Sequence, residues 1–289
     1  MVKESLLKEV AAAATLASTL PSRLGLCYES TQMRFQIIFP RIHGCCLISA
    51  LAILAMMPES AFAGAPFQTD DPVVIDVAHT DIVVFNQQTL AASGRSGTLA
   101  GVEIHYGPIP NLEVDLGMPY NFDFPTDGSA QRGYGDTTLA LKYRLIQESD
   151  TKPQVSFLPK LNLSTGNADR GLGNGGDQLF LALALQKNNG KLQMNVHGGY
   201  WINNGAENRN YWFLGWQAQY AFTSHWRLGI EVFHTSPQVV GQGRETGFNV
   251  GGYYLFDSKN QVLFSAGKGL QNAAETNRVS TYLGYQRSL

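Results

Sequence analysis

The stretch from Gly133 to Leu145, GYGDTTLALKYRL, constrains the fold more than any other part of the chain. Alternate positions from residue 137 to 145 hold Thr, Leu, Leu, Tyr and Leu, whereas the positions between them hold Thr, Ala, Lys and Arg. This two-residue period is typical of a β-strand whose faces meet different surroundings. Similar segments of roughly nine to twelve residues recur from about residue 79 to the last residue. Such a series predicts a β-barrel that crosses a membrane.

We expect about twelve antiparallel strands in meander order. They are predicted at residues 79–90, 99–107, 111–119, 134–147, 154–165, 178–188, 191–203, 210–222, 226–236, 246–257, 261–270 and 278–289. The connections after even-numbered strands are short turns, and those after odd-numbered strands are longer and richer in Gly, Asn and charge. This alternation is expected when the two ends of a barrel face different compartments. It disfavours the alternative, a β-sandwich with Greek-key crossings. The predicted fold class is all-β, a transmembrane antiparallel β-barrel.

The overall composition argues against two other classes of protein. Of the 289 residues 15% are charged, and the formal net charge is −2. A nucleic-acid partner would require a basic patch, so none is expected. No run of about 18 apolar residues is present to make a membrane-spanning helix. The three cysteines, Cys27, Cys45 and Cys46, lie near the N-terminus, so removal of a leader would leave no disulfide or thiol chemistry.

The N-terminal region has the three parts of a secretory signal peptide. Arg34 and Arg41 supply positive charge, and residues 45–57 form an apolar segment that is too short to span a bilayer. The tripeptide Ala61-Phe62-Ala63 matches the cleavage signal that follows such a segment. A lipoprotein is disfavoured because neither cysteine of the apolar segment follows it, as lipidation requires.

These features predict the organisation of the chain. We interpret residues 1–32 as a mis-assigned N-terminal extension, residues 33–63 as a signal peptide with translation starting at Met33, and residues 64–289 as the barrel of a Gram-negative outer membrane. The C-terminal sequence YLGYQRSL resembles the signal that barrel-assembly machinery recognises, although an arginine replaces the usual aromatic or apolar residue. The expected partners are outer-membrane lipid, the assembly machinery and a small-molecule solute.

The two faces of the strands predict which side chains meet lipid and which meet the lumen. Backbone groups in hydrocarbon must be paired within the protein, so the sheet has to close on itself. A Lys or Arg on the lipid face would cost on the order of 2–4 kcal/mol at midplane. The side chains predicted to line the lumen are Glu103, His105, Glu113, Asp115, Asp136, Lys142, Arg144, Lys160, His197, Arg227 and Glu231. The aromatic residues predicted for the membrane interfaces are Tyr106, Tyr143, Trp212, Trp216, Tyr220 and Tyr254.

The predicted lumen charges differ in sign from strand to strand. Acidic residues and a histidine lie on the second and third strands, and Lys142, Arg144 and Lys160 lie on the fourth and fifth. Two interpretations remain open. The charges pair and fill the interior structurally, or they form a constriction that selects polar or aromatic solutes.

Four stretches carry a resemblance to a known family. They are GAPFQTDDP at 64–72, GYGDTTLALKYR at 133–144, LPKLNLSTGNADRGLGNG at 158–175, and LGIEVFHTSP followed by TGFNVGGYY within 228–254. In their order and spacing they resemble the outer-membrane proteins grouped as the putative MetA-pathway of phenol degradation. Residues 160–166 depart from the pattern, because the family often has a proline before the Thr-Gly pair. The resemblance implies a barrel fold and a role in transport.

No catalytic, cofactor-binding or metal-binding residues are predicted. The histidines lack metal-ligand spacing. The Gly-rich stretch 166–177 lacks both the lysine of a phosphate loop and a calcium-binding repeat, so we interpret it as an extracellular loop. For a lipid hydrolase at the rim, the nearest candidates are His234 and Ser236. For an acidic protease of the barrel type, the candidates at the outer rim are Asp123, Asp127, Asp136 and His234.

The predicted function is that of an outer-membrane channel or transporter for passive uptake of small solutes, aromatic or hydrophobic ones among them, without enzymatic activity. Two alternatives stay open. One is an outer-membrane enzyme of the lipid-hydrolase type at the barrel rim, and the other is a closed structural or adhesion barrel.

Overall fold

A computed structural model describes residues 65–205 and 207–289 of the chain. The expected N-terminal extension (1–32) and signal peptide (33–63) lie outside the described residues, so both remain predictions. Within the described residues no helix is long and apolar enough to cross a bilayer. The described helical structure is one 3₁₀ turn, η1 (Ala168–Arg170), in a loop.

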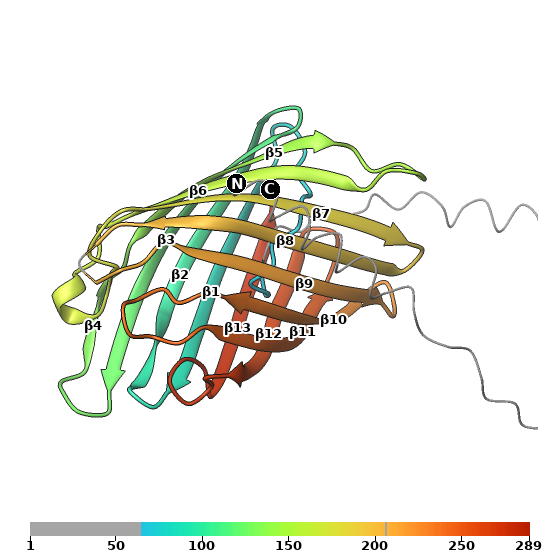
Figure 1. The fold of residues 1–289 in the computed structure, drawn as a ribbon. Helices are drawn as coiled ribbons and strands as arrows, with labels where there is room; N and C mark the ends of the chain where they lie inside the picture. The colour runs from blue at the N-terminus through green and yellow to red at the C-terminus, as the bar shows by residue number, and fades with distance from the viewer. Residues whose placement is uncertain (1–64, 206) are drawn as a thin grey trace, which may run out of the picture. The chain divides into compact units, whose positions relative to one another are not determined.

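The described residues form an antiparallel β-barrel (Figure 1). Its strands are β1 (Thr80–Ala91), β2 (Gly94–Ile109), β3 (Leu112–Pro125), β4 (Gln131–Tyr134), β5 (Thr137–Ile146), β6 (Gln154–Leu163), β7 (Gln178–Asn189), β8 (Leu192–Asn203), β9 (Tyr211–Ala221), β10 (Trp226–Thr235), β11 (Glu245–Leu255), β12 (Asn260–Gln271) and β13 (Val279–Ser288). Each strand pairs with its neighbour in sequence, except that β4 and β5 both pair with β3. The ring closes because β1 pairs with β13 as well as with β2. The predicted barrel with meander topology is therefore confirmed.

The strand expected at residues 134–147 is β5, which begins at Thr137, and the short strand β4 precedes it where a connection was expected. Both pair with β3 and share one position in the ring. The break between them falls at Gly135 and Asp136. The Asp136 carboxylate leaves the ladder and accepts hydrogen bonds from the backbone N–H groups of Gly166 (2.9 Å) and Asn174 (2.7 Å). The break therefore ties the barrel wall to the loop between β6 and β7.

The hairpin of β2 and β3 extends further than the sequence predicts. β2 begins at Gly94 and β3 ends at Pro125, whereas ends at residues 99 and 119 were expected. The added rungs pair Ser96 with Asp123 and Gly94 with Pro125. The added part of β2 is polar and rich in glycine, so it shows no two-residue period. In β3, by contrast, the aromatic residues Tyr120, Phe122 and Phe124 do alternate with polar ones in a segment that was expected to be a loop.

The predicted outward face is exposed along the strands. On β5, Leu139, Leu141 and Tyr143 are exposed, whereas Ala140 and Lys142 between them are buried. The aromatic residues expected at the membrane interfaces also lie on this outward face, and Trp212 is the most exposed of them at 62%.

This outward face predicts a large cost for a charge placed on it. Leu183 is 46% exposed and lies near the middle of β7. We expect Leu183→Lys to lower the free energy of unfolding in lipid vesicles by about 2–4 kcal/mol, because a midplane ammonium loses its hydration. Val240→Lys is the matched control, since Val240 is 63% exposed but lies in the connection between β10 and β11. Urea titration in vesicles measures both, and equal losses would contradict the proposed lipid face.

The interior is less polar than the sequence predicts. Leu158, Phe180, Ala182, Ala184, Phe213 and Phe233 form an apolar cluster on the inward face of β6, β7, β9 and β10. Trp201 of β8 packs against this cluster and stacks on Phe180 with a ring separation of 4.5 Å. One wall of the lumen is therefore packed like the core of a soluble protein.

Candidate functional site

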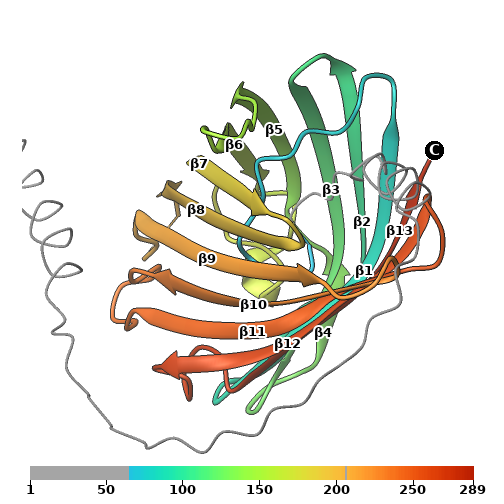
Figure 2. The ribbon, with the colours of Figure 1, turned by 90° about the vertical axis from the view of Figure 1, so that its right-hand side faces the viewer.

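The first described residues lie inside the ring of strands rather than in it. Figure 2 shows them as a light-blue tube within the barrel. Residues 65–76, here called the plug, belong to no strand. Phe67, Thr69, Asp71 and Val74 of this segment are buried. The plug is therefore packed within the lumen.

Backbone groups of the plug need partners from the wall because the plug makes no ladder hydrogen bonds. Pro66 and Pro72 also lack an N–H and disfavour a strand. The Ser265 hydroxyl donates to the Pro66 carbonyl (2.7 Å), and the Gln154 amide donates to the Pro72 carbonyl (2.7 Å). The Tyr253 hydroxyl donates to the Ala65 carbonyl (2.8 Å). Side chains of the wall thus replace the missing backbone partners.

Glu231 is the main acceptor for the N-terminal part of the plug. It is fully buried on β10. Its carboxylate accepts hydrogen bonds from the backbone N–H groups of Gln68 (3.1 Å) and Thr69, and from the Asn249 amide (2.6 Å). The next residue, Asp70, donates its backbone N–H to His197 Nδ1 (3.1 Å). These contacts hold the centre of the plug against β8, β10 and β11.

Glu113 and Lys142 hold the C-terminal part of the plug. The Ile75 N–H donates to Glu113 Oε2 (2.7 Å), and Lys142 Nζ donates to the Val73 carbonyl (3.1 Å). The two wall residues also form an ion pair, with 3.3 Å between Lys142 Nζ and Glu113 Oε1. An acid and a base from neighbouring strands thus bind an N–H and a carbonyl of the same segment.

Two neighbouring aspartates of the plug, Asp70 and Asp71, differ in their surroundings. Burial raises the pKa of Asp71 to about 7, although Lys142 and the Val73 N–H oppose this shift. Burial acts in the same direction on Asp70, but Lys160, 3.5 Å away, His197 and Lys142 together outweigh it and lower the pKa of Asp70 to about 2. The docked plug therefore carries one carboxylate that ionises only near neutral pH.

This difference predicts how docking of the plug depends on pH. The pKa of Asp71 is about 7 in the docked plug and 3.8 in water. Between these values the docked state holds the extra proton, so its stability is greatest at acid pH and is lost as the pH rises to about 7. One proton corresponds to at most about a tenfold change in the docking constant per pH unit. Asp70 adds no pH dependence above pH 3.8, because its pKa is lowered and it is ionised in both states there. Its stabilisation of the docked state is lost as the pH falls from 3.8 to about 2.

We therefore expect the open probability in planar bilayers to rise between pH 5 and pH 7. Lys142, Glu113 and Asp70 are the charged groups that act on Asp71. Asp71→Asn keeps the shape of the side chain and removes its titration, so this variant is expected to flatten the profile. An unchanged profile in the variant would assign the pH dependence to other groups.

Cavities lie on both sides of the plug. One, of about 500 Å³, lies against Pro66, Gln68 and Asp70 and reaches Thr89 and Ser96 near the end of the barrel that carries the long loops. Another, of about 1000 Å³, lies against Asp71, Val73 and Asp76 and reaches the short turns at the other end, around residues 148–150 and 188–191. The two cavities share no lining residue. The plug thus separates two cavities within one barrel.

The structure places the side chains predicted to line the lumen in three settings. Those that line the 500 Å³ cavity are Glu103, His105, Asp115, Lys142 and Lys160. Arg144 and Arg227 line the 1000 Å³ cavity, and Asp136 lines a third of about 420 Å³ near the loops. Glu113, His197 and Glu231 are buried in contact with the plug. The acidic strand β3 and the basic strand β5 are joined by the ion pair of Glu113 with Lys142, whereas Lys160 forms an ion pair with Asp70 of the plug.

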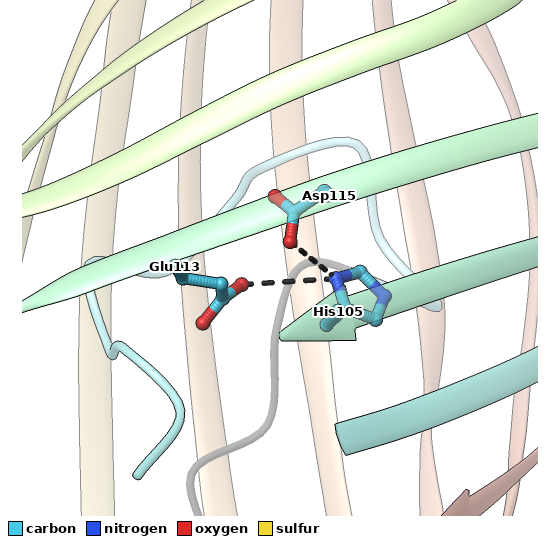
Figure 3. A group of neighbouring side chains, drawn as sticks. All are labelled: His105, Glu113 and Asp115. Carbon is cyan, nitrogen blue, oxygen red and sulfur yellow. Dashed lines mark hydrogen bonds and ion pairs between the residues drawn. The ribbon is translucent and has the colours of Figure 1, made fainter. Parts of the chain in front are cut away.

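Three of these side chains converge on one point of the wall (Figure 3). His105 of β2 directs Nδ1 toward Asp115 Oδ1 (2.8 Å) and Glu113 Oε1 (3.7 Å), both on β3. The three ligand-type atoms lie within 4.8 Å of one another. Ligand spacing along the chain does not reveal this group, because antiparallel pairing of β2 with β3 brings the residues together.

The residues considered for a hydrolase at the rim have other partners. His234 Nδ1 hydrogen bonds with the Thr246 hydroxyl (2.8 Å), and the Ser236 hydroxyl accepts from the Trp212 N–H (2.9 Å). Asp136, considered for a protease, binds backbone N–H groups of the β6–β7 loop. The described geometry thus provides no nucleophile–base pair at these positions.

Comparisons with known proteins agree with this architecture. An outer membrane channel from Pseudomonas putida F1 aligns over 76% of this chain and 98% of its own, with a TM-score of 0.61 and 20% sequence identity. The NanC porin aligns over 72% and 100% (TM-score 0.53, 10% identity), and the KdgM porin over 72% and 99% (0.51, 14%). At these identities the likeness shows a shared barrel fold. No curated protein matches the sequence. A family model described as "Putative MetA-pathway of phenol degradation" matches residues 96–286.

Proposed function

This chain belongs to the family described as "Putative MetA-pathway of phenol degradation", and we propose that it is an outer-membrane channel for passive passage of small solutes, held shut by its own plug. The observation that carries the proposal is the pair of cavities separated by residues 65–76 within a closed barrel. A barrel of about twelve strands leaves a narrow bore that inward side chains nearly fill. One inserted segment is therefore sufficient to block it.

The way in which the plug is held supports a gate rather than a permanent filling. Alongside the buried side chains of Phe67 and Val74, hydrogen bonds with side chains of the wall hold the plug along its length, each contributing about 0.5–1.5 kcal/mol net. An apolar core of the same size would be harder to withdraw, because each large apolar side chain contributes roughly 1.5–3 kcal/mol on burial. The plug instead exposes polar backbone to polar walls, and water replaces such partners when it leaves.

Charge on the inward side chains indicates the class of solute. The acidic ones that are buried or line the three cavities are Asp70, Asp71, Asp76, Asp81, Glu103, Glu113, Asp115, Asp136, Glu148, Asp150 and Glu231, and the basic ones are Lys142, Arg144, Lys160, Lys187, Lys191 and Arg227. Acids remain in excess when the plug and its three aspartates leave. The proposed open bore therefore favours cations and neutral solutes over anions.

We expect reversal potentials across a salt gradient to show a preference for K⁺ over Cl⁻ in the open channel. Glu103→Gln removes one carboxylate from the 500 Å³ cavity without touching the plug contacts described above. This variant is expected to lower the cation-to-anion permeability ratio. Glu275→Gln is the matched control and should leave the ratio unchanged, because Glu275 is exposed in the connection between β12 and β13 and lines none of the three cavities. A preference for anions in the wild-type protein would overturn the proposed solute class.

An enzyme at the rim and a closed structural barrel are the competing proposals. The partners of His234 and Ser236 give no support to the first. The second predicts no current from any form of the protein, including one without residues 65–76. Bilayer recordings of that deletion therefore decide between a closed barrel and a channel.

A further inference from the structure

His105, Glu113 and Asp115 offer the ligand set of a divalent transition-metal ion. One imidazole nitrogen and two carboxylates are common ligands of Zn²⁺ and its neighbours, at bond lengths of about 2.0–2.2 Å. Ligand atoms of one tetrahedral ion lie about 3.5 Å apart. The three atoms lie within 4.8 Å of one another, so side-chain rotations that move them by about 1 Å bring them to that separation.

A second observation points to a ligand at the same place. Glu113 is 1% exposed, and its Oε1 accepts no hydrogen bond within the described part of the chain. This atom faces His105 Nδ1 at 3.7 Å and Lys142 Nζ at 3.3 Å. A buried carboxylate oxygen without a hydrogen bond loses hydration without full compensation. A metal ion at this point would bind this oxygen directly, next to the ion pair that it already forms with Lys142.

The surroundings of His105 also suit a metal ligand. Its other ring nitrogen, Nε2, lies 3.8 Å from Glu103 Oε2. A carboxylate on the far side of a histidine is the usual arrangement that orients the ring toward a metal. His105, Asp115 and Glu103 line the 500 Å³ cavity, which gives an ion a route to the site.

We propose that His105, Glu113 and Asp115 form a binding site for a divalent transition-metal ion in the lumen wall. When the ion binds, a bond to Nδ1 replaces the N–H that faces Asp115 Oδ1, and that proton leaves to solvent. Lys142 competes with the ion for Glu113 and weakens binding. The site does not require that the barrel conduct, so its test is independent of the proposed channel.

The test is calorimetric titration of the purified, untagged protein in detergent with Zn²⁺. One ion per chain is expected. Titration in two buffers of different ionisation enthalpy should show about one proton released at a pH where Nδ1 carries one. Co²⁺ in place of Zn²⁺ should give visible absorption bands from nitrogen and oxygen ligands. Zn²⁺ binding without proton release, or Co²⁺ bands no different from those of the aqueous ion, would overturn the assignment.

Four variants and a control locate the site. His105→Gln, Glu113→Gln and Asp115→Asn should each weaken binding at least about tenfold. Lys142→Met should tighten it, because the competing charge is removed, and a misfolded protein would not produce that gain. His234→Gln is the control, because His234 pairs with Thr246. Unchanged affinity in His105→Gln, weaker binding in Lys142→Met, or an equal loss in His234→Gln would each overturn the site.

Discussion

Deletion of residues 65–76 is expected to convert a channel that is shut most of the time into one that conducts continuously. The plug lies between the 500 Å³ and 1000 Å³ cavities, and its removal joins them. The barrel itself should remain folded, because the strands that form the ring begin at Thr80. Planar-bilayer recordings of the deletion and of the wild-type protein measure the change. Absence of current steps from the deletion would refute the proposed channel.

A reversible lock provides the control for this deletion. A Cβ placed on Gly215 of β9 lies 3.1 Å from the Thr69 Cβ, so Thr69→Cys combined with Gly215→Cys places two thiols close together. The natural cysteines all lie in the first 46 residues, outside the described barrel. We expect the oxidised double variant to stay closed and to recover wild-type openings when reduced. Conduction unaffected by the disulfide would show that solutes pass without movement of the plug.

Replacement of Glu231 is expected to produce the largest effect of any single residue on the gate. Glu231→Leu leaves the backbone N–H groups of Gln68 and Thr69 without their acceptor. An unsatisfied buried donor costs about 1–3 kcal/mol, so the docking equilibrium should shift toward release by at least about tenfold. The measured quantity is the open probability at fixed voltage and pH.

A graded series separates this effect from general damage to the lumen. Glu231→Gln retains one carbonyl oxygen that can accept from a plug N–H, and we expect an open probability between those of the wild-type protein and Glu231→Leu. Gln286→Leu alters another buried polar side chain, one that bonds to Asp81 and Gln261 rather than to the plug. It should leave the gate unchanged. Equal opening in all three variants would show that loss of lumen polarity, not loss of the Glu231 contacts, opens the channel.

Most of the barrel could be predicted from sequence because lipid requires apolar side chains at every second position, on the outer face of each strand. Strands such as β7, where leucines alternate with small or polar residues, show that rule directly. β9 shows its limit. Tyr211 and Phe213 face inward, whereas Trp212 and Leu214 face outward, so both faces are apolar. Alternation then locates a strand but does not show that its inner face packs into an apolar cluster.

The candidate site was predictable only in part, for a different reason. Glu113, Lys142 and Glu231 could be assigned to the inward face from their own strands. Their partners could not, because the plug lies far from them in sequence: Thr69 and Glu231 are 162 residues apart. The sequence held one indication of the plug. The stretch 64–72 has two aspartates and two prolines without alternation, and it precedes strands that carry inward lysines. Pairing between a non-strand segment and a barrel wall follows no period in sequence.

The short connection between the plug and β1 determines how the gate can recover. Only residues 77–79 separate them, and this connection is fixed to β2 by hydrogen bonds of Ala78 and His79 with Gly107 (2.8 and 3.2 Å). A released plug therefore stays within a few residues' length of its binding position in the lumen, where its effective concentration is of millimolar order. Reclosure is then a unimolecular event whose rate does not depend on protein concentration. A synthetic peptide of residues 65–76 added to the deletion variant would have to reach similar concentrations to block it.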